Sequence, residues 1–255
     1  MMTVLRDDLV KQLSRMLRVD QFNDYCPNGL QVEGAGTVRR IISGVTASQA
    51  LIEAAIERQA DTVLVHHGYF WKGEPAAVAG MKKQRLKLLL EHDINLLAYH
   101  LPLDAHAEFG NNVQLARVLD LPVSGELMKQ NNQVMGLFAD LDEAISGEQL
   151  ASRLHEKLGR QALHIAPSAN KTIKRIAWCT GGAQSYIHRA VDIGADAYIS
   201  GEVSEPTFHT ARELGIHYYA AGHHATERYG AKALGEWLAA EYDLVHEFVD
   251  IDNPV

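Results

Sequence analysis

Two segments of the chain resemble each other at a constant offset of 135 residues, and this repeat limits the possible folds more than any other feature. The first segment runs from 40 to 68 and the second from 175 to 203. They align without gaps, and Asp61 matches Asp196. Two unrelated segments of similar composition are the alternative, but the gapless match favours an internal duplication.

Each segment is predicted to form a strand, a turn, a helix and a second strand. In the first segment the strands at 41–45 and 62–67 are rich in β-branched residues. Between them, Leu51, Ile52 and Ala55 recur at helical spacing. A strand–helix–strand unit of this length is a βαβ crossover, so its two strands should be parallel.

A further helix end and strand follow each segment, at 91–104 and at 214–227. The sequence therefore predicts an α/β fold with two related, βαβ-containing halves, residues 1–125 and 126–255. Each half has the size of an ordinary domain. The boundary is approximate because residues 124–140 show no helical period, and the halves could exchange elements.

Several of the 13 histidines stand with carboxylates directly after predicted strands. Ligands of parallel α/β sheets bind beyond the carboxyl ends of the strands, and clustered histidines and carboxylates favour metal binding. The candidate metal ligands are His66, His67, Asp104, His223 and Glu227. Three imidazoles and two carboxylates are many for one ion, so we expect two divalent ions per chain, in the cleft between the halves.

Two spacing arguments support these ligands. His66 and His67 are neighbours in a strand, so their side chains should point to opposite faces and could serve two ions. His223 and Glu227 are four residues apart, and the helix-forming run at 225–238 would place them on one helical face. A single histidine at a strand end is more often a core or rim residue than a ligand. The prediction therefore depends on all five residues converging.

Four further residues are candidates for groups behind the ligands or for proton carriers: Glu202, His209, His100 and His224. Glu202 stands at the repeat position of His67. The catalytic residues stay unassigned. The sequence contains no GxxxxGK[ST] loop, no GxGxxG after a strand and no GxSxG elbow, so chemistries built on these motifs are less favoured than a metal site. The glycine pair at 181–182 could bind an anion or could form a tight turn.

Composition narrows the setting of the protein. The net charge of −8 argues against nucleic acid as a main partner. The two cysteines, Cys26 and Cys179, form no CxxC pattern, so a disulfide framework is not indicated. No signal-peptide pattern and no run of about 20 apolar residues is present, so we expect a cytoplasmic protein that does not enter a membrane.

Five motifs together resemble the Nif-three-like dinuclear metal-centre family in its short bacterial form. They are YCPNGLQVEG (25–34), VHHGYFWKG (65–73), YHLPLDAHAEFGNN (99–112), SGEVSEPTFH (200–209) and AAGHHATER (220–228). The resemblance covers nearly the whole chain. By motif, the ligands of the family fall on the same five residues that spacing nominates, His66, His67, Asp104, His223 and Glu227.

The resemblance also implies properties that composition does not show. Bacterial members are often described as GTP cyclohydrolase I type 2 homologues, which implies a metal-dependent hydrolase acting on a nucleotide-like small molecule. The metal would be iron, zinc, manganese or magnesium, and the assembly a homohexameric ring. The alternatives are a non-catalytic or regulatory metal-binding ring protein and a metal storage protein, so whether the chain is an enzyme stays open at this point.

Overall fold

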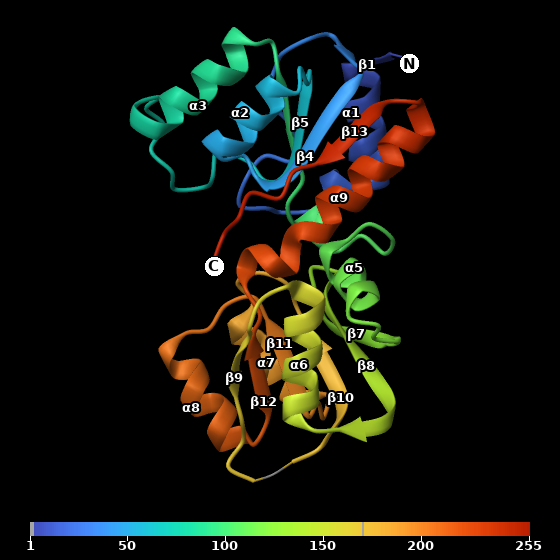
Figure 1. Cartoon of the computed structure of the whole chain (residues 1–255), viewed down its shortest axis with the longest axis vertical. Helices are drawn as coiled ribbons and strands as arrows, with labels where there is room; N and C mark the ends of the chain where they lie inside the picture. Colours follow the sequence, from blue (N-terminus) through green and yellow to red (C-terminus); the bar gives the residue numbers. More distant parts are fainter. Residues whose placement is uncertain (1–2, 170) are drawn as a thin grey trace. The chain divides into compact units, whose positions relative to one another are not determined.

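The computed structural model describes residues 3–169 and 171–255 (Figure 1). The chain divides into two compact units. Unit 1 comprises Met1–Phe109 and Gly230–Asp252, and unit 2 comprises Gly110–Tyr229 and Asn253–Val255. None of the helices in the described ranges has both the length and the apolar character needed to cross a bilayer.

Unit 1 is built on a five-stranded mixed sheet with the strand order β13-β4-β5-β6-β2. The strands are β13 (Val245–Phe248), β4 (Arg40–Thr46), β5 (Thr62–His67), β6 (Asn95–Ala98) and β2 (Gly29–Val32). The first four are parallel, and β2 is antiparallel to β6. The parallel pairing of β4 with β5 confirms the predicted βαβ unit. A separate antiparallel pair joins β1 (Val4–Leu5) to β3 (Thr37–Val38).

Helices cover both faces of this sheet. The helices of unit 1 are α1 (Arg6–Met16), η1 (Val19–Gln21), α2 (Gln49–Glu57), α3 (Gly80–Glu91), α4 (Leu101–Asp104) and the second part of α9 (His223–Tyr242). Successive strand residues enter opposite cores: Ile42 packs with α2 and α3, whereas Ile41 packs with α1 and α9. This alternation follows from the pleat of a strand that is buried on both faces.

Unit 2 contains a six-stranded mixed sheet with the order β7-β8-β10-β11-β12-β9. The strands are β7 (Val123–Gln130), β8 (Gln133–Ile145), β9 (Leu163–Ile165), β10 (Ile173–Trp178), β11 (Ala197–Ser200) and β12 (His217–Ala220). The three central strands, β10, β11 and β12, are parallel, and the remaining pairings are antiparallel. The parallel strands are the ones predicted from the second repeat segment and its continuation.

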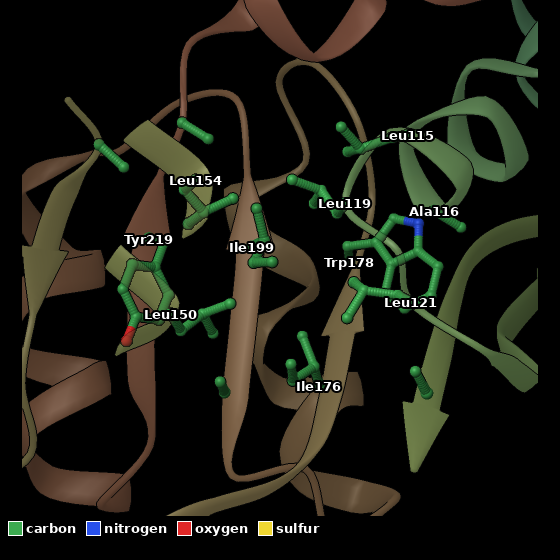
Figure 2. Packing of buried hydrophobic residues seen from close by; sticks show 14 of the residues in the cluster. Leu115, Ala116, Leu119, Leu121, Leu150, Leu154, Ile176, Trp178, Ile199 and Tyr219 are labelled. Atoms are coloured by element: carbon green, nitrogen blue, oxygen red, sulfur yellow. The ribbon is translucent and has the colours of Figure 1, made fainter. Parts of the chain in front are cut away.

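Helices also pack on both faces of the second sheet. They are α5 (Asn111–Val118), α6 (Gly147–Leu158), η2 (Gln184–Tyr186), α7 (Ile187–Asp192), α8 (Glu205–Leu214) and the start of α9. Figure 2 shows one of the two cores, where Trp178 and Ile199 from the strands meet Leu115 of α5 and Leu154 of α6. Tyr198 and Tyr218 lie in the other core, with α7 and α8.

The two units differ from the predicted halves in two places, the boundary between them and the segment 230–252. Residues 124–140 lie within the β7–β8 hairpin, whose turn at Asn131 and Asn132 has positive φ at both residues. Because β7 and β8 extend the second sheet and α5 packs in its core, residues 110–125 belong to unit 2. The segment 230–252 returns to unit 1, since β13 pairs with β4.

Asp61 and Asp196, the matched aspartates of the repeat, have the same local role. Asp61 accepts hydrogen bonds from the backbone N–H groups that begin β4. Asp196 accepts from the N–H groups of Lys174 and Arg175 at 2.9 Å each, and Lys171 lies 3.0 Å away. Burial alone raises the pKa of Asp196, but these donors together lower it below its usual value.

We expect Asp196→Asn to lower the free energy of unfolding at pH 7 by about 1–3 kcal/mol. The carboxylate has a depressed pKa in the folded state, so its contribution is complete above the unfolded value of about 4. The contribution is lost as pH falls through the folded pKa, so the two proteins should become more alike in acid. Urea unfolding at several pH values measures this, with Asp192→Asn as the exposed control. A deficit that stays constant down to about pH 2 would contradict the argument.

Candidate metal centre

The carboxyl ends of β5 and β6 bring three histidines of unit 1 together. One ring nitrogen each of His66, His67 and His100 lies within 4.8 Å of the others, which is a spacing that could hold a metal ion. Asp104, at the end of α4, joins them, with its Oδ1 at 3.5 Å from Nε2 of His66. The ring of His66 is fully buried. Unit 1 therefore brings together three predicted metal ligands and His100, which was predicted to lie behind the ligands.

Strand alternation predicted that the side chains of His66 and His67 point to opposite faces, but the structure places the two rings side by side. Their ring centroids are 4.5 Å apart at an angle of 44°. His67 is the last residue of β5, and Gly68 follows in close contact with the neighbouring chain segments. A Cβ at Gly68 would lie 2.1 Å from Oε1 of Gln31 and 2.6 Å from Cβ of Ala98. The alternation holds only inside the strand, so both rings reach the same cluster.

Each of the three histidines of this cluster is held through its Nδ1 atom. The contacts are His66 to the carbonyl of Tyr99 (3.0 Å), His67 to Oγ1 of Thr46 (3.2 Å) and His100 to Oδ1 of Asp24 (2.7 Å). A carbonyl or carboxylate can only accept, so Nδ1 of His66 and of His100 carries the proton. The lone pair of a neutral ring is then on Nε2, which is the arrangement found in histidines that bind metals.

Asp24 contacts this cluster, and no sequence pattern pointed to it. Its side chain is only 3% exposed, and it accepts from His100, from Nδ2 of Asn28 and from the N–H of Leu101. Burial raises the pKa of Asp24, but the His100 and Asn28 contacts outweigh it and keep the pKa below its usual value. Asp24 and His100 are 76 residues apart in the chain, so no spacing pattern links them.

Unit 2 contributes a second cluster at the end of β12. His223 and Glu227 lie one turn apart at the start of α9, as predicted, with 3.1 Å between Nε2 and Oε2. Nδ1 of His223 lies 2.7 Å from Oε1 of Glu202, which follows β11. The other oxygen of Glu202 accepts from Gln184 at 3.3 Å. Glu202 thus orients His223.

The charge of this cluster favours a cation. Burial by itself lowers the pKa of His223, but Glu227 and Glu202 raise it to about 9 through hydrogen bonds and charge. Glu227 is almost fully buried, with 4% of its side chain exposed. Two carboxylates around one imidazole therefore hold a proton at neutral pH, and a divalent cation would take its place.

The glycine pair at 181–182 forms a tight turn packed against the second cluster. The N–H of Gly181 donates to Oγ1 of Thr226, and its carbonyl accepts from Ser200 and from the N–H of Gly201. A Cβ at Gly181 would meet Oε1 of Glu227 at 2.1 Å. This turn therefore fixes the position of Glu227.

The remaining two candidates lie in different surroundings. His224 is buried in the first turn of α9, and its N–H donates to the carbonyl of Val255. His209 lies on α8 with 62% of its side chain exposed, and Nε2 is 3.1 Å from Oε1 of Glu205. The geometry brings Glu202 and His100 into the clusters and assigns no such contact to His209.

We expect Glu202→Gln to weaken the binding of a divalent metal by about ten-fold, because losing an orienting carboxylate typically has an effect of this size. The pKa of His223 in the metal-free protein should fall from its raised value, since one negative charge is removed. Competition with a chelator measures the affinity, and NMR titration of the imidazole measures the pKa. Glu205→Gln is the matched control, because its imidazole partner is exposed. Equal affinity of Glu202→Gln and wild type would contradict the orienting role.

The donor sets of both clusters suit a borderline transition metal. Imidazole nitrogen combined with carboxylate oxygen favours zinc, iron or manganese, whereas magnesium prefers an all-oxygen environment. The rings of His66 and His223 are each held by an acceptor at Nδ1, and Nε2 of each lies within 3.5 Å of a carboxylate oxygen. The residues present therefore fit a metal group.

Fold and site together define an α/β protein with candidate metal-ligating clusters at the carboxyl ends of its strands. The chain belongs to the Duf34/NIF3 family (NGG1p interacting factor 3), which it matches over residues 4–254. This match confirms the resemblance that the motifs indicated.

Relatives and solved structures agree with this assignment. The chain is 54% identical over 247 residues to the GTP cyclohydrolase 1 type 2 homolog of Yersinia pestis, covering 97% of this chain and 98% of the relative. Identity to the protein of that name from Pseudomonas aeruginosa is 55% over 253 residues, covering 99% and 100%. The solved structure of protein ybgI, of unknown function, matches with a TM-score of 0.94 at 50% identity, covering 99% and 100%. The solved structure of TTHA1606 from Thermus thermophilus matches with a TM-score of 0.88 at 35% identity, again covering 99% of this chain and 100% of that chain.

Proposed function

We propose that the chain is a metal-dependent hydrolase with a dinuclear centre. Its ligands would be His66, His67, Asp104, His223 and Glu227. The observation that carries the proposal is the fixing of all three ligand histidines through Nδ1, by Tyr99, Thr46 and Glu202. Core histidines without a ligand have no need of a common orientation, whereas metal-binding histidines are held in this way.

The two clusters would serve one centre, formed in the cleft between the related halves. Unit 1 offers two imidazoles and a carboxylate, and unit 2 offers one imidazole and a carboxylate. Neither set alone completes the coordination of two ions, whereas five protein ligands with a bridging carboxylate suit a pair. An internal duplication explains why both clusters follow the ends of corresponding parallel strands.

Bound ions would supply a water molecule that ionises near neutral pH. The residues of the chain would hold and orient the ligands. Glu202 fixes the ring of His223, and Asp24 fixes the ring of His100. His100 would then direct its Nε2 towards the cluster, where it could bind a polar group of the substrate.

The proposed substrate is a nucleotide-like small molecule, such as a purine nucleotide opened hydrolytically at its imidazole ring. Support comes from the relatives at 54–55% identity, which carry the name GTP cyclohydrolase 1 type 2 homolog. The proposed assembly is a homohexameric ring in the cytoplasm, as the family resemblance implies. Large apolar side chains on and near α8, Val203, Phe208 and Leu214, are exposed in the single chain and could be covered in such an assembly.

Metal analysis of the purified protein tests the centre directly. Wild type should hold two ions per chain, and His66→Ala and Glu227→Ala should each hold one or none. His92→Ala and Glu236→Ala are matched controls, because both side chains are exposed and lie outside the clusters. Wild type purified without chelators yet lacking metal would overturn the dinuclear centre.

Incubation of the metal-loaded protein with GTP, followed by chromatography of the products, tests the reaction. Ring-opened product that depends on Glu227 would support the hydrolase. Two tightly bound ions without turnover of GTP or related nucleotides would instead favour the non-catalytic, regulatory alternative.

A further inference from the structure

Two aromatic side chains stand beside the histidine cluster of unit 1 and have no part in holding a metal. The ring of Trp71 lies 5.0 Å from that of His100 and 5.9 Å from that of His67. The ring of Tyr25 lies 6.4 Å from that of His100. These contacts are tilted or T-shaped, at 57–85°, so within residues 3–169 and 171–255 no aromatic ring stacks in parallel on either one.

Hydrogen bonds to the backbone fix the ring of Trp71 and the chain segment that carries Tyr25. Nε1 of Trp71 donates to the carbonyl of Gly68 at 3.1 Å, and the N–H of Lys72 donates to the carbonyl of Tyr25 at 2.7 Å. The second bond joins the two segments that carry the aromatic rings. A surface that is ordered before its ligand arrives loses less entropy on binding.

Exposure separates these rings from ordinary core residues. Tyr25 has 58% of its area exposed, and Trp71 is partly exposed. Large rings in water next to a cluster of imidazoles are suited to stacking with a planar heterocycle, since every such ring has a π-face. Alternatively, Trp71 could serve only as a cover for His67 and His100. That interpretation does not explain Tyr25, which is mostly in water.

We propose that Tyr25 and Trp71 form a stacking wall that recognises the planar ring of the substrate beside the histidine cluster. This inference rests on the proposed function, because it places the ring next to the proposed metal ligands. Tyr25 and Trp71 would then make the site prefer compounds that carry a heteroaromatic ring to sugar phosphates that lack one.

The test compares two probes that share a sugar phosphate and differ in the ring, guanosine 5′-monophosphate and ribose 5-phosphate. Calorimetric titration of the metal-loaded wild type should show tighter binding of the nucleotide. Tyr25→Ala and Trp71→Ala should each weaken nucleotide binding by between about five-fold and about 150-fold, the range for loss of one stacked aromatic side chain. Binding of ribose 5-phosphate should stay the same in these variants.

Two controls separate stacking from structural damage. Trp71→Phe keeps an aromatic face and should retain most of the nucleotide affinity. Phe70→Ala removes an exposed aromatic ring of the same loop that packs with Lys82 and Tyr69 instead of the histidines, and it should leave affinity unchanged. Metal content is measured on every variant, and because Tyr25 is mostly exposed, its removal should not disturb the ligands.

Three results would overturn the wall: equal binding of the two probes, wild-type nucleotide affinity in both alanine variants, or no nucleotide binding by a protein that holds its two ions. Failure of the proposed metal centre has a different signature, which is absence of metal from the wild type. A nucleotide affinity that depends on both rings in such metal-free protein would support the wall and count against the dinuclear centre.

Discussion

Trp178→Ala is expected to lower the free energy of unfolding by about 3–5 kcal/mol, the usual cost of emptying a large aromatic position in a core. Trp178 is fully buried in β10 and lies among Leu115, Leu119 and Leu121 (Figure 2). Its Nε1 also donates to the carbonyl of Asn112 at 2.9 Å, which would lose this donor. The cavity and the unsatisfied carbonyl would both lower the free energy of unfolding.

Urea unfolding followed by circular dichroism measures this loss. Trp178→Phe is the control, because it keeps most of the apolar volume and removes only part of the ring and the donor. It should cost less than the alanine variant. A loss below about 1 kcal/mol for Trp178→Ala would contradict this prediction and would mean that the core of unit 2 closes over the missing ring.

Gly181→Ala is expected to weaken metal binding on the order of 100-fold, the upper part of the range for disturbing the surroundings of a ligand. The added Cβ would lie 2.1 Å from Oε1 of Glu227, so the carboxylate has to move. The φ of Gly181 is +67°, which is also unfavourable for alanine.

Gly194→Ala separates these two effects. Gly194 has a similar φ of +72°, but a Cβ there would have no heavy atom within 4 Å. Both variants should lose a comparable amount of stability from the left-handed backbone, and only Gly181→Ala should lose metal affinity in a chelator competition. Equal metal affinity of the two variants would show that Glu227 is not fixed by this turn.

Local pattern was sufficient to predict the central architecture. The strands at 41–45 and 62–67 were predicted because they are rich in β-branched residues, and the structure buries both faces of the sheet around them. The helix carrying His223 and Glu227 was predicted from good helix formers and spacing, which are also local properties.

Long-range pairing could not be predicted in this way. Nothing in the residues of β13 indicates that it joins β4, some 200 positions earlier in the chain. The same reason hid Asp24 and Thr46, which hold His100 and His67 by contacts between distant segments. Candidate ligands were found because imidazoles and carboxylates gather in short motifs, whereas the groups that orient them are scattered.

The return of the chain to unit 1 has a consequence for synthesis on the ribosome. The first sheet lacks its edge strand β13, and its core lacks Leu234 and Leu238 of α9, until residues 230–252 have been made. When synthesis reaches residue 230, all of unit 2 except Asn253–Val255 has already been made. At typical elongation rates of about 5–20 residues per second, the interval between Phe109 and Gly230 lasts roughly 6–24 s. The N-terminal segment must therefore remain soluble while incomplete, and the later-made unit can finish folding first.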